Sequence, residues 1–309
     1  MANPVGIDVT ALSNYVEEKR LPLIAKSFMR GKTVDLVQLE TGVLQDTALN
    51  LLGSNLSFQA GDTCGWDPEG NVALSQRLLK PVFIKINMPF CDKDLLKKWA
   101  SYEVKLAAGR EQLPFEEAFM DEIARGINEH IETLIWQGDS NNTAEPDGFL
   151  AILEAVGSGV VEAEWAQGTS AYNKIKAVYN KIPANIIDKE DTVIFVGEET
   201  YRAYIQDLVA ANLYHFDPDY KDGEYKLPGT SVRVIAVNGL NGEDKIVGGR
   251  LSNFFYGVGA EDDKDTFDFW YSKDNREFRL ACYFAIAAQI AYPNEVVLGQ
   301  EAENAEPGQ

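Results

Sequence analysis

The sequence predicts a mixed α+β protein organised around one long helix. Three observations predict this class. Apolar residues recur at helical spacing from Pro114 to Gln137, a strict two-residue alternation runs from Val82 to Met88, and helix and strand patterns follow each other between residues 146 and 249. No tandem repeat and no low-complexity linker divides the chain. We therefore expect an α/β segment that is inserted between the long helix and a later set of strands.

Composition and charge narrow the range of functions. The chain has 309 residues, 45% of them hydrophobic, which is enough for one or two cores. Its net charge of −20 disfavours a general nucleic-acid-binding surface, because affinity for phosphates comes from Lys and Arg. The scattered cysteines predict neither a disulfide framework nor a zinc site. No signal-peptide pattern or long apolar run is present, so we expect a protein that is made and used in a cytoplasm.

Residues 1–36 are expected to form an N-terminal arm, and residues 37–90 an extended loop. The arm concentrates basic residues among short apolar clusters, and its pattern allows one short helix. The loop holds two strand signals, of which Val82–Met88 is the clearer, separated by the turn-rich run Gly61–Gly70. Because a two-stranded hairpin alone is only marginally stable in water, we expect this ribbon to lie on another surface, such as that of a neighbouring subunit.

The helix from Pro114 to Gln137 follows a shorter predicted helix, which runs from Asp92 to about Leu106. At about 1.5 Å per residue the long helix would measure roughly 36 Å. Its apolar face comprises Phe115, Phe119, Ile123, Ile127, Ile131, Leu134 and Ile135. We expect the arm and the strand around Phe284 to cover that face. The charged side chains then left toward solvent or a neighbour are Asp121, Arg125, Glu129 and Glu132.

Residues 146–249 predict a compact α/β segment, which the turn Pro146-Asp147-Gly148 begins. In chain order, its expected elements are a helix over 172–182, a buried strand over 192–196, a helix over 201–209 and a strand over 231–237. This order of elements is typical of strands joined by covering helices.

Residues 250–299 predict strands that return to the long helix. After a strand at Phe254–Tyr256, a hairpin is expected between Phe267–Tyr271 and Glu277–Ala291. In the last strand bulky residues alternate with alanines, which makes one of its faces flat enough for close packing. Residues 300–309 are acidic and resemble a disordered tail.

The sequence contains no convincing catalytic, cofactor-binding or metal-binding group, and we predict that the protein is not an enzyme. His130 and His215 fit no metal-ligand spacing. The run Asp217–Glu224 departs from a calcium loop because Lys221 occupies a ligand position and Pro228 stands where the bidentate glutamate belongs.

The other polar candidates also have ordinary explanations. Ser158 lacks the glycine spacing of a nucleophile elbow, and Cys64 lacks an identifiable base. The acidic run Glu261–Asp265 is expected to be a solvated turn. We therefore predict no catalytic residue, no cofactor and no metal.

Four local runs, taken in order, resemble those of one known family. They are Ile131–Asp139 with Pro146–Leu150, Thr192–Val196 with the helix from Glu198, Leu227–Thr230 with Val232 and Val234, and Tyr271–Pro293. They resemble the end of the spine helix, the axial domain, its following strand and the closing strands of the major capsid proteins of tailed bacteriophages, the Hong Kong 97 fold family. The resemblance covers roughly residues 36–299.

This resemblance implies an α+β fold of the Hong Kong 97 type. It would have an N-arm, an extended β-hairpin loop, a spine helix in a peripheral domain made from residues 91–145 and 250–299, and an inserted axial domain at 146–249. It also implies self-assembly into hexamers and pentamers of an icosahedral virion capsid in the host cytoplasm. Such a shell would enclose double-stranded DNA without sequence-specific contacts and without a membrane.

The resemblance also implies partners other than the chain itself. The type member's long N-terminal scaffolding segment has no counterpart here, so we expect either a separate scaffold protein or removal of such a segment. A portal protein is a further expected partner, and decoration proteins are an optional one. The type member's Lys–Asn cross-link is not carried over, because no motif marks Lys80, Lys85, Asn275 or Asn294.

Two other functions stay open at the level of sequence. An encapsulin-type nanocompartment would keep the fold and enclose an enzyme instead of a genome, and the neighbouring genes would discriminate between the two. An α/β enzyme would need a pocket with converging polar groups beside the inserted segment.

Overall fold

The computed structural model describes residues 31–56, 70–91, 115–141, 145–155, 157–213, 224–259, 267–272, 274–275 and 277–302. Within these ranges the chain is an α+β structure with a five-stranded sheet, a six-stranded sheet and a two-stranded ribbon. Several predicted features lie outside the described residues. They are the first 30 residues of the arm, the turn-rich run 61–69, the helix from Asp92 to Leu106 and the tail from residue 303.

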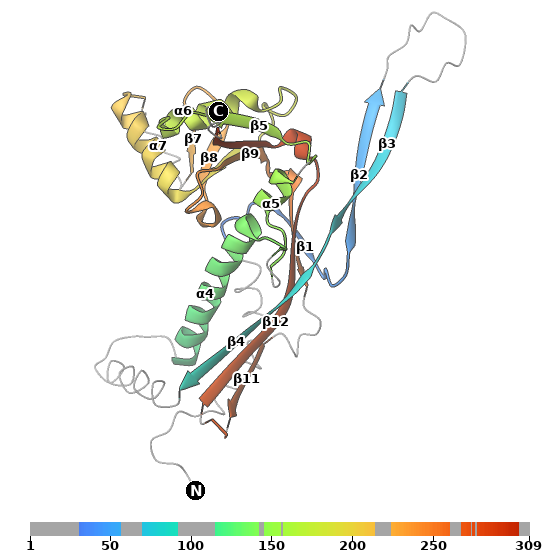
Figure 1. Cartoon of the computed structure of the whole chain (residues 1–309), viewed down its shortest axis with the longest axis vertical. Coiled ribbons are helices and arrows are strands. Elements are labelled where there is room, and N and C mark those ends of the chain that lie inside the picture. The colour runs from blue at the N-terminus through green and yellow to red at the C-terminus, as the bar shows by residue number, and fades with distance from the viewer. Residues whose placement is uncertain are drawn as a thin grey trace, which may run out of the picture.

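Figure 1 shows two packed parts and one projecting ribbon. The lower part contains helix α4 (Phe115–Gln137) beside the long strands β4 (Val82–Cys91) and β12 (Glu277–Ile290). The upper part is the six-stranded sheet, and the five-stranded sheet is called the lower sheet below. The ribbon runs away from both parts, and its elements are β2 (Thr47–Leu56) and β3 (Gly70–Leu79).

The lower sheet is built around β12. Strand β4 pairs antiparallel with one edge of β12, over residues 277–286. The opposite edge pairs antiparallel with two strands in succession, β11 (Phe267–Ser272) and β10 (Phe254–Gly259). Strand β1 (Gln38–Thr41) then pairs parallel with β10. The predicted hairpin between residues 267–271 and 277–291 is confirmed.

Helix α4 lies within one residue of its predicted limits and covers one face of the lower sheet. Ile127 and Ile131 share a buried cluster with Phe284 of β12, as the sequence predicted. Val34 and Val37, which lie where the predicted arm meets the loop, belong to the same cluster. Both expected covers of the apolar helix face are therefore confirmed.

The alternation in β4 has the predicted cause, but its assignment to the ribbon was wrong. Even-numbered side chains from Val82 to Phe90 are partly buried, and odd-numbered ones are exposed. The ribbon is formed by β2 and β3, whereas β4 pairs with β12 over its length. Strand β3 leads into β4 through Lys80 and Pro81. Its sequence lacks a clean alternation, so the pattern did not reveal it as a separate strand.

The upper sheet has the strand order β5-β13-β9-β6-β8-β7. Its strands are β5 (Val161–Trp165), β13 (Val297–Glu301), β9 (Ile246–Arg250), β6 (Thr192–Val196), β8 (Arg233–Ala236) and β7 (Glu224–Lys226). The remaining elements are α5 (Phe149–Glu154), α6 (Ala171–Lys181), α7 (Glu198–Ala210), η1 (Asn238–Leu240), η2 (Leu251–Asn253) and η3 (Pro293–Glu295). The predicted helices at 172–182 and 201–209 correspond to α6 and α7.

Strand β6 separates two cores. Its Val193 and Phe195 belong to the cluster that also contains residues of α4 and β12, whereas Ile194 and Val196 face the cluster beneath α6 and α7. Because neither face of this strand meets water, the whole strand is buried, and its sequence is a continuous apolar run after Thr192.

Strand β13 corrects the prediction for the end of the chain. Residues up to 299 were assigned to the return strands and residues 300–309 to a disordered tail. The structure instead pairs Val297–Glu301 parallel with β5, and pairs the first part of β13 antiparallel with β9. Gly299 permits this position, because a Cβ there would lie 2.5 Å from atoms of both Trp165 and Val178. The acidic residues Glu301, Glu303 and Glu306 led to the prediction of a tail and concealed a strand whose first three residues are buried.

Candidate interaction surfaces

One face of the ribbon carries exposed leucines. Leu52 and Leu74 are a cross-strand pair with 63% and 79% of their surfaces exposed, and Leu78 is exposed on the same face. Between them, Gln76 Nε2 donates a hydrogen bond to Asn50 Oδ1 at 2.8 Å. Because exposed large apolar side chains that lie together mark interaction sites better than scattered ones, Leu52, Leu74 and Leu78 form a candidate surface, called the leucine stripe below.

The base of the ribbon rests on small residues of the lower sheet. Leu79 is fully buried in a cluster with Val43, Leu49 and Ala287. Register places Gly257 opposite Ala287, and Gly259 opposite Ala285. The flat alanine face predicted for β12 is confirmed, and β10 extends it with glycines. These four small residues, Gly257, Gly259, Ala285 and Ala287, are called the ribbon seat.

The ribbon seat has no room for larger side chains. A Cβ on Gly257 would lie 2.6 Å from Leu79 Cδ2, and a Cβ on Gly259 would lie 2.3 Å from the carbonyl oxygen of Val43. Both distances are far below van der Waals contact. Absence of side chains at these two positions therefore determines how closely the ribbon base approaches the sheet.

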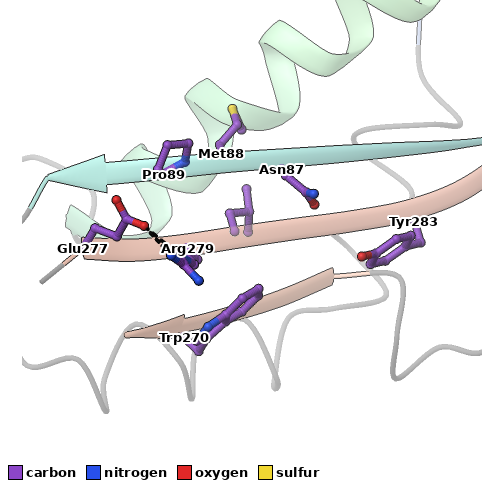
Figure 2. Close-up of a pocket in the computed structure, with 8 residues that line it drawn as sticks. Asn87, Met88, Pro89, Trp270, Glu277, Arg279 and Tyr283 are labelled. Carbon is purple, nitrogen blue, oxygen red and sulfur yellow. Dashed lines mark hydrogen bonds and ion pairs between the residues drawn. The ribbon is translucent and has the colours of Figure 1, made fainter. Parts of the chain in front are cut away.

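The face of the lower sheet opposite α4 forms a second candidate surface. It exposes Phe83, Trp270 and Tyr283, and register places Trp270 and Pro89 on either side of Arg279. Figure 2 shows Pro89, Trp270, Arg279 and Tyr283 around a cavity of about 480 Å³. Aromatic and arginine side chains are enriched at protein interfaces. We call this face the outer sheet face.

An ion pair lies at the edge of that cavity. Arg279 Nη2 donates to Glu277 Oε1 at 2.7 Å, and the hydrogen bond from Arg279 lowers the pKa of Glu277. Asn275 in the preceding turn also donates to Glu277 Oε1, at 3.2 Å. Lys80, Lys85 and Asn294, the other residues considered for a cross-link, are exposed.

A buried carboxylate joins the end of the arm to α4. The backbone N–H of Thr33 donates to Glu132 Oε1 at 3.1 Å and to Oε2 at 3.3 Å, and the Thr33 hydroxyl donates to Oε1. Thr33 Oγ1 accepts in turn from Trp136 Nε1 at 2.8 Å. Burial raises the pKa of Glu132, while the hydrogen bonds from Thr33 oppose that increase.

The predicted exposure of Glu132 is wrong. Only 5% of its surface is exposed, because Thr33 supplies donors that offset the loss of water. Arg125 and Glu129 are exposed as predicted and form an ion pair at 2.9 Å, and Asp121 is partly exposed. Sequence reasoning missed Thr33, since no local pattern connects it with a residue 99 positions away.

The end of α4 is fixed where the two parts of the molecule meet. The Trp136 ring makes edge contacts with Phe149 of α5 and Phe195 of β6, at centroid distances of 5.3 and 5.0 Å. A Cβ on Gly239 would lie 2.2 Å from Trp136 Cδ1, so only glycine permits this approach of η1. The aromatic contacts of Trp136 thus connect the long helix with the upper sheet.

The candidate catalytic and metal-binding residues that lie in the described ranges do not come together in one site. His130 is exposed on α4, and Ser158 Oγ donates to the carbonyl oxygen of Leu153 at 2.8 Å. Cys64, His215 and the acidic runs 217–223 and 261–265 lie outside the described residues. Within the described ranges no group of three His, Cys, Asp or Glu could hold a metal ion. No helix of that part is long and apolar enough to cross a membrane.

Comparison with solved structures identifies the fold. A chain of the satellite phage P4 procapsid matches with a TM-score of 0.60 at 10% identity, over 98% of this chain and 94% of that one. A chain of Gordonia phage Cozz gives 0.59 at 11% identity, over 89% and 87%. The protein has the capsid fold of the Hong Kong 97 type. The capsid of the native GTA particle shares this capsid fold with a TM-score of 0.52 at 11% identity, over 90% and 91%.

The capsid fold was predicted from the order of local runs, and at the level of fold that prediction is confirmed. No family model and no curated protein matches the sequence. In this capsid fold α4 is the spine helix, and β2 with β3 is the extended loop.

Proposed function

We propose that the chain is a major capsid protein, which self-assembles into hexamers and pentamers of an icosahedral shell around double-stranded DNA. The leucine stripe on the projecting ribbon is the observation that carries this proposal. The ribbon points away from both packed parts of its own chain (Figure 1), so Leu52 and Leu74 need a second molecule to become buried.

The magnitude of this burial fits assembly from many weak contacts. Full burial of one leucine stabilises by about 1.5–3 kcal/mol. The pair Leu52 and Leu74 would therefore contribute at most about 3–6 kcal/mol per ribbon, before the entropy cost of association is subtracted. One such contact is too weak to hold two copies together firmly. A closed shell repeats it in every subunit.

The outer sheet face supports the same proposal from another side. Its Trp270, Tyr283 and Arg279 have the side-chain types that are enriched at protein contacts. Two exposed apolar surfaces on separate elements give one subunit more than one neighbour, which a shell requires and a simple dimer does not.

The remaining parts of the proposal follow from the fold resemblance and the charge. Residues 91–145 and 250–296 would serve as the peripheral domain, and residues 146–249 together with β13 as the axial domain. A separate scaffold protein, a portal and optional decoration proteins would be partners during assembly in the host cytoplasm. The net charge of −20 fits a shell whose lining does not bind DNA tightly.

Electron microscopy and analytical ultracentrifugation of the purified full chain test the proposal. The expected result is closed shells, sheets or hexameric rings, with or without an added scaffold. Leu52→Ser with Leu74→Ser should leave the subunit folded and reduce assembly at least tenfold. Shells purified from infected cells should contain double-stranded DNA, and an enzyme cargo in its place would favour the nanocompartment.

The matched control is Asn50→Ser with Gln76→Ser. This pair lies beside the leucine pair on the same ribbon face and preserves the leucine stripe. It should assemble as the wild type does. A wild-type chain that stays monomeric at high concentration with and without scaffold would contradict the proposal.

A further inference from the structure

Two neighbouring residues of β3, Arg77 and Leu78, hydrogen-bond the ribbon to the lower sheet. Arg77 Nη1 donates to Gln289 Oε1 at 3.2 Å and to the carbonyl oxygen of Ile290 at 2.9 Å. In the opposite direction, Gln289 Nε2 donates to the carbonyl oxygen of Leu78 at 2.8 Å. Hydrogen bonds thus run both ways between the base of the ribbon and the end of β12.

Gln289 is itself fixed in orientation. Its Oε1 also accepts from the backbone N–H of Ile290 at 3.0 Å. With both ends of the amide engaged, a rotation that exchanged oxygen and nitrogen would break these bonds. Arg77 is partly buried, which lowers the pKa of its guanidinium, and its charge is directed onto neutral acceptors in this network.

These contacts lie at the boundary between the seated and the projecting parts of the ribbon. Toward the base, Leu79 is buried against the ribbon seat. Toward the tip, Leu74 and Leu52 are exposed. Arg77 therefore lies where a lever would have its fulcrum, with the seated Leu79 at the short end and with Leu52 and Leu74 of the leucine stripe on the long end.

The lever amplifies small rotations. From Arg77 to Gly70 the strand extends about 23 Å, at about 3.3 Å per residue. A rotation of roughly 10° about the fulcrum would displace Gly70 at the far end by about 4 Å, and Leu74, about 10 Å from Arg77, by about 2 Å. The position of the leucine stripe is therefore sensitive to whatever fixes the angle at Arg77.

We propose that Arg77 and Gln289 are positioning residues that set the angle between the ribbon and the lower sheet, and thereby the curvature of the assembled shell. The second half of this statement rests on the proposed function, and the first half does not. A merely stabilising role would change the free energy of unfolding without changing the angle.

The angle is measured on the dilute, unassembled full chain with two spin labels. One label replaces Asn71 near the far end of β3, and the other replaces His130, which is exposed on α4 beside the lower sheet. Both are introduced through a ketone-bearing amino acid that avoids the native cysteines. Arg77→Met, which keeps the aliphatic stem, and Gln289→Met should each widen the distance distribution at least twofold. Arg77→Lys, which keeps one donor, should widen it less.

Gln76→Met is the matched control, because Gln76 neighbours Arg77 but points to the exposed face, and among the described residues its side chain bonds to Asn50 of the ribbon. Its distribution should equal that of the wild type. An unchanged distance distribution in both Arg77→Met and Gln289→Met would overturn the proposed positioning role of these two residues. If one variant fails to fold, the other still tests that role.

Shell diameters then test the link to curvature. Arg77→Met and Gln289→Met should broaden the distribution of diameters at least twofold relative to the wild type and to Gln76→Met. Normal shells from variants with a widened label distribution would overturn that link. A wild type that forms no shells would contradict the proposed function, while the label distances would still decide whether Arg77 and Gln289 fix the ribbon.

Discussion

Thr33 and Glu132 lie 99 positions apart in the sequence, and three hydrogen bonds join them in a buried site. Glu132→Ala should therefore destabilise the chain by about 1–3 kcal/mol or more, because it leaves the two buried donors of Thr33 without an acceptor. Glu132→Gln retains one acceptor oxygen and should lose less. Urea unfolding of the full chain measures both effects. Glu129→Ala, at an exposed position on the same helix, is the control and should show no measurable change.

The same carboxylate predicts a dependence of stability on pH. Burial raises the pKa of Glu132 above its unfolded value of about 4.3, against the hydrogen bonds from Thr33 and the charge of Lys32, while Asp35 raises it further. Tyr256 of β10 also faces this group, and Glu132 contributes to the increase in the pKa of Tyr256. Because the folded chain holds the proton more tightly, the contribution of Glu132 to stability is full below the unfolded pKa. It is lost as pH rises through the folded pKa.

The difference in unfolding free energy between the wild type and Glu132→Gln isolates this contribution. It should fall as pH increases from about 4 toward neutrality and then level off. Urea titrations at a series of pH values provide the measurement. A difference that grows with pH would show that the hydrogen bonds from Thr33 outweigh burial.

The ribbon seat predicts an order of severity for two glycine substitutions. Gly259→Ala should cost about 1–3 kcal/mol, because its Cβ would meet the backbone oxygen of Val43, which cannot move alone. Gly257→Ala should cost less, since it meets the flexible end of Leu79. Thermal unfolding of both variants compares them directly. The reverse order would contradict the assigned packing of the ribbon base.

A substitution at Gly126 is predicted to raise the stability of the chain instead of lowering it. It lies inside α4, and a Cβ there would meet nothing within 4 Å. Gly126→Ala should therefore stabilise the unassembled chain by about 0.5–1 kcal/mol through the higher helix propensity of alanine. Calorimetry of the dilute chain is the appropriate measurement. A loss of stability would contradict the open surroundings of Gly126 in the single chain.

Ile127 tests the packing of α4 on the lower sheet. It is buried in the cluster that includes Phe284, so Ile127→Asp would place an unpaired charge between helix and sheet and should abolish soluble folding. Arg125→Asp introduces the same side chain on the exposed side of the helix and should remain soluble. The soluble fraction after expression distinguishes them, and normal shells from Ile127→Asp would contradict the packing.

Periodic patterns predicted the elements whose surroundings are uniform along their length. Helix α4 presents one face to one sheet, and β4 presents alternate residues to α4 and to solvent. In both, each residue's environment follows from its position in the repeat. The sequence therefore predicted the limits of α4 and the alternation of β4.

Local sequence patterns could not predict the pairing between segments that are distant in the chain. The ribbon partner β3 has no clear period, and β13 ends at Glu301, where an acidic stretch begins, so local composition suggested other roles for both. Glu132 and Arg77 acquire their functions from Thr33 and Gln289, which lie far away in the chain. No local sequence motif marks such residues, because each one contacts its partner residue only after the chain has folded.

The position of β13 between β5 and β9 also determines when the upper sheet of a newly made chain can close. On the ribosome, β5, β6, β8 and β9 are synthesised before residues 297–301, yet β5 reaches its place in the upper sheet only through β13. A nascent chain therefore cannot close this sheet, and incomplete products lack a finished upper part. Under the proposed function, only chains whose translation has passed Glu301 can contribute a complete upper part to a shell.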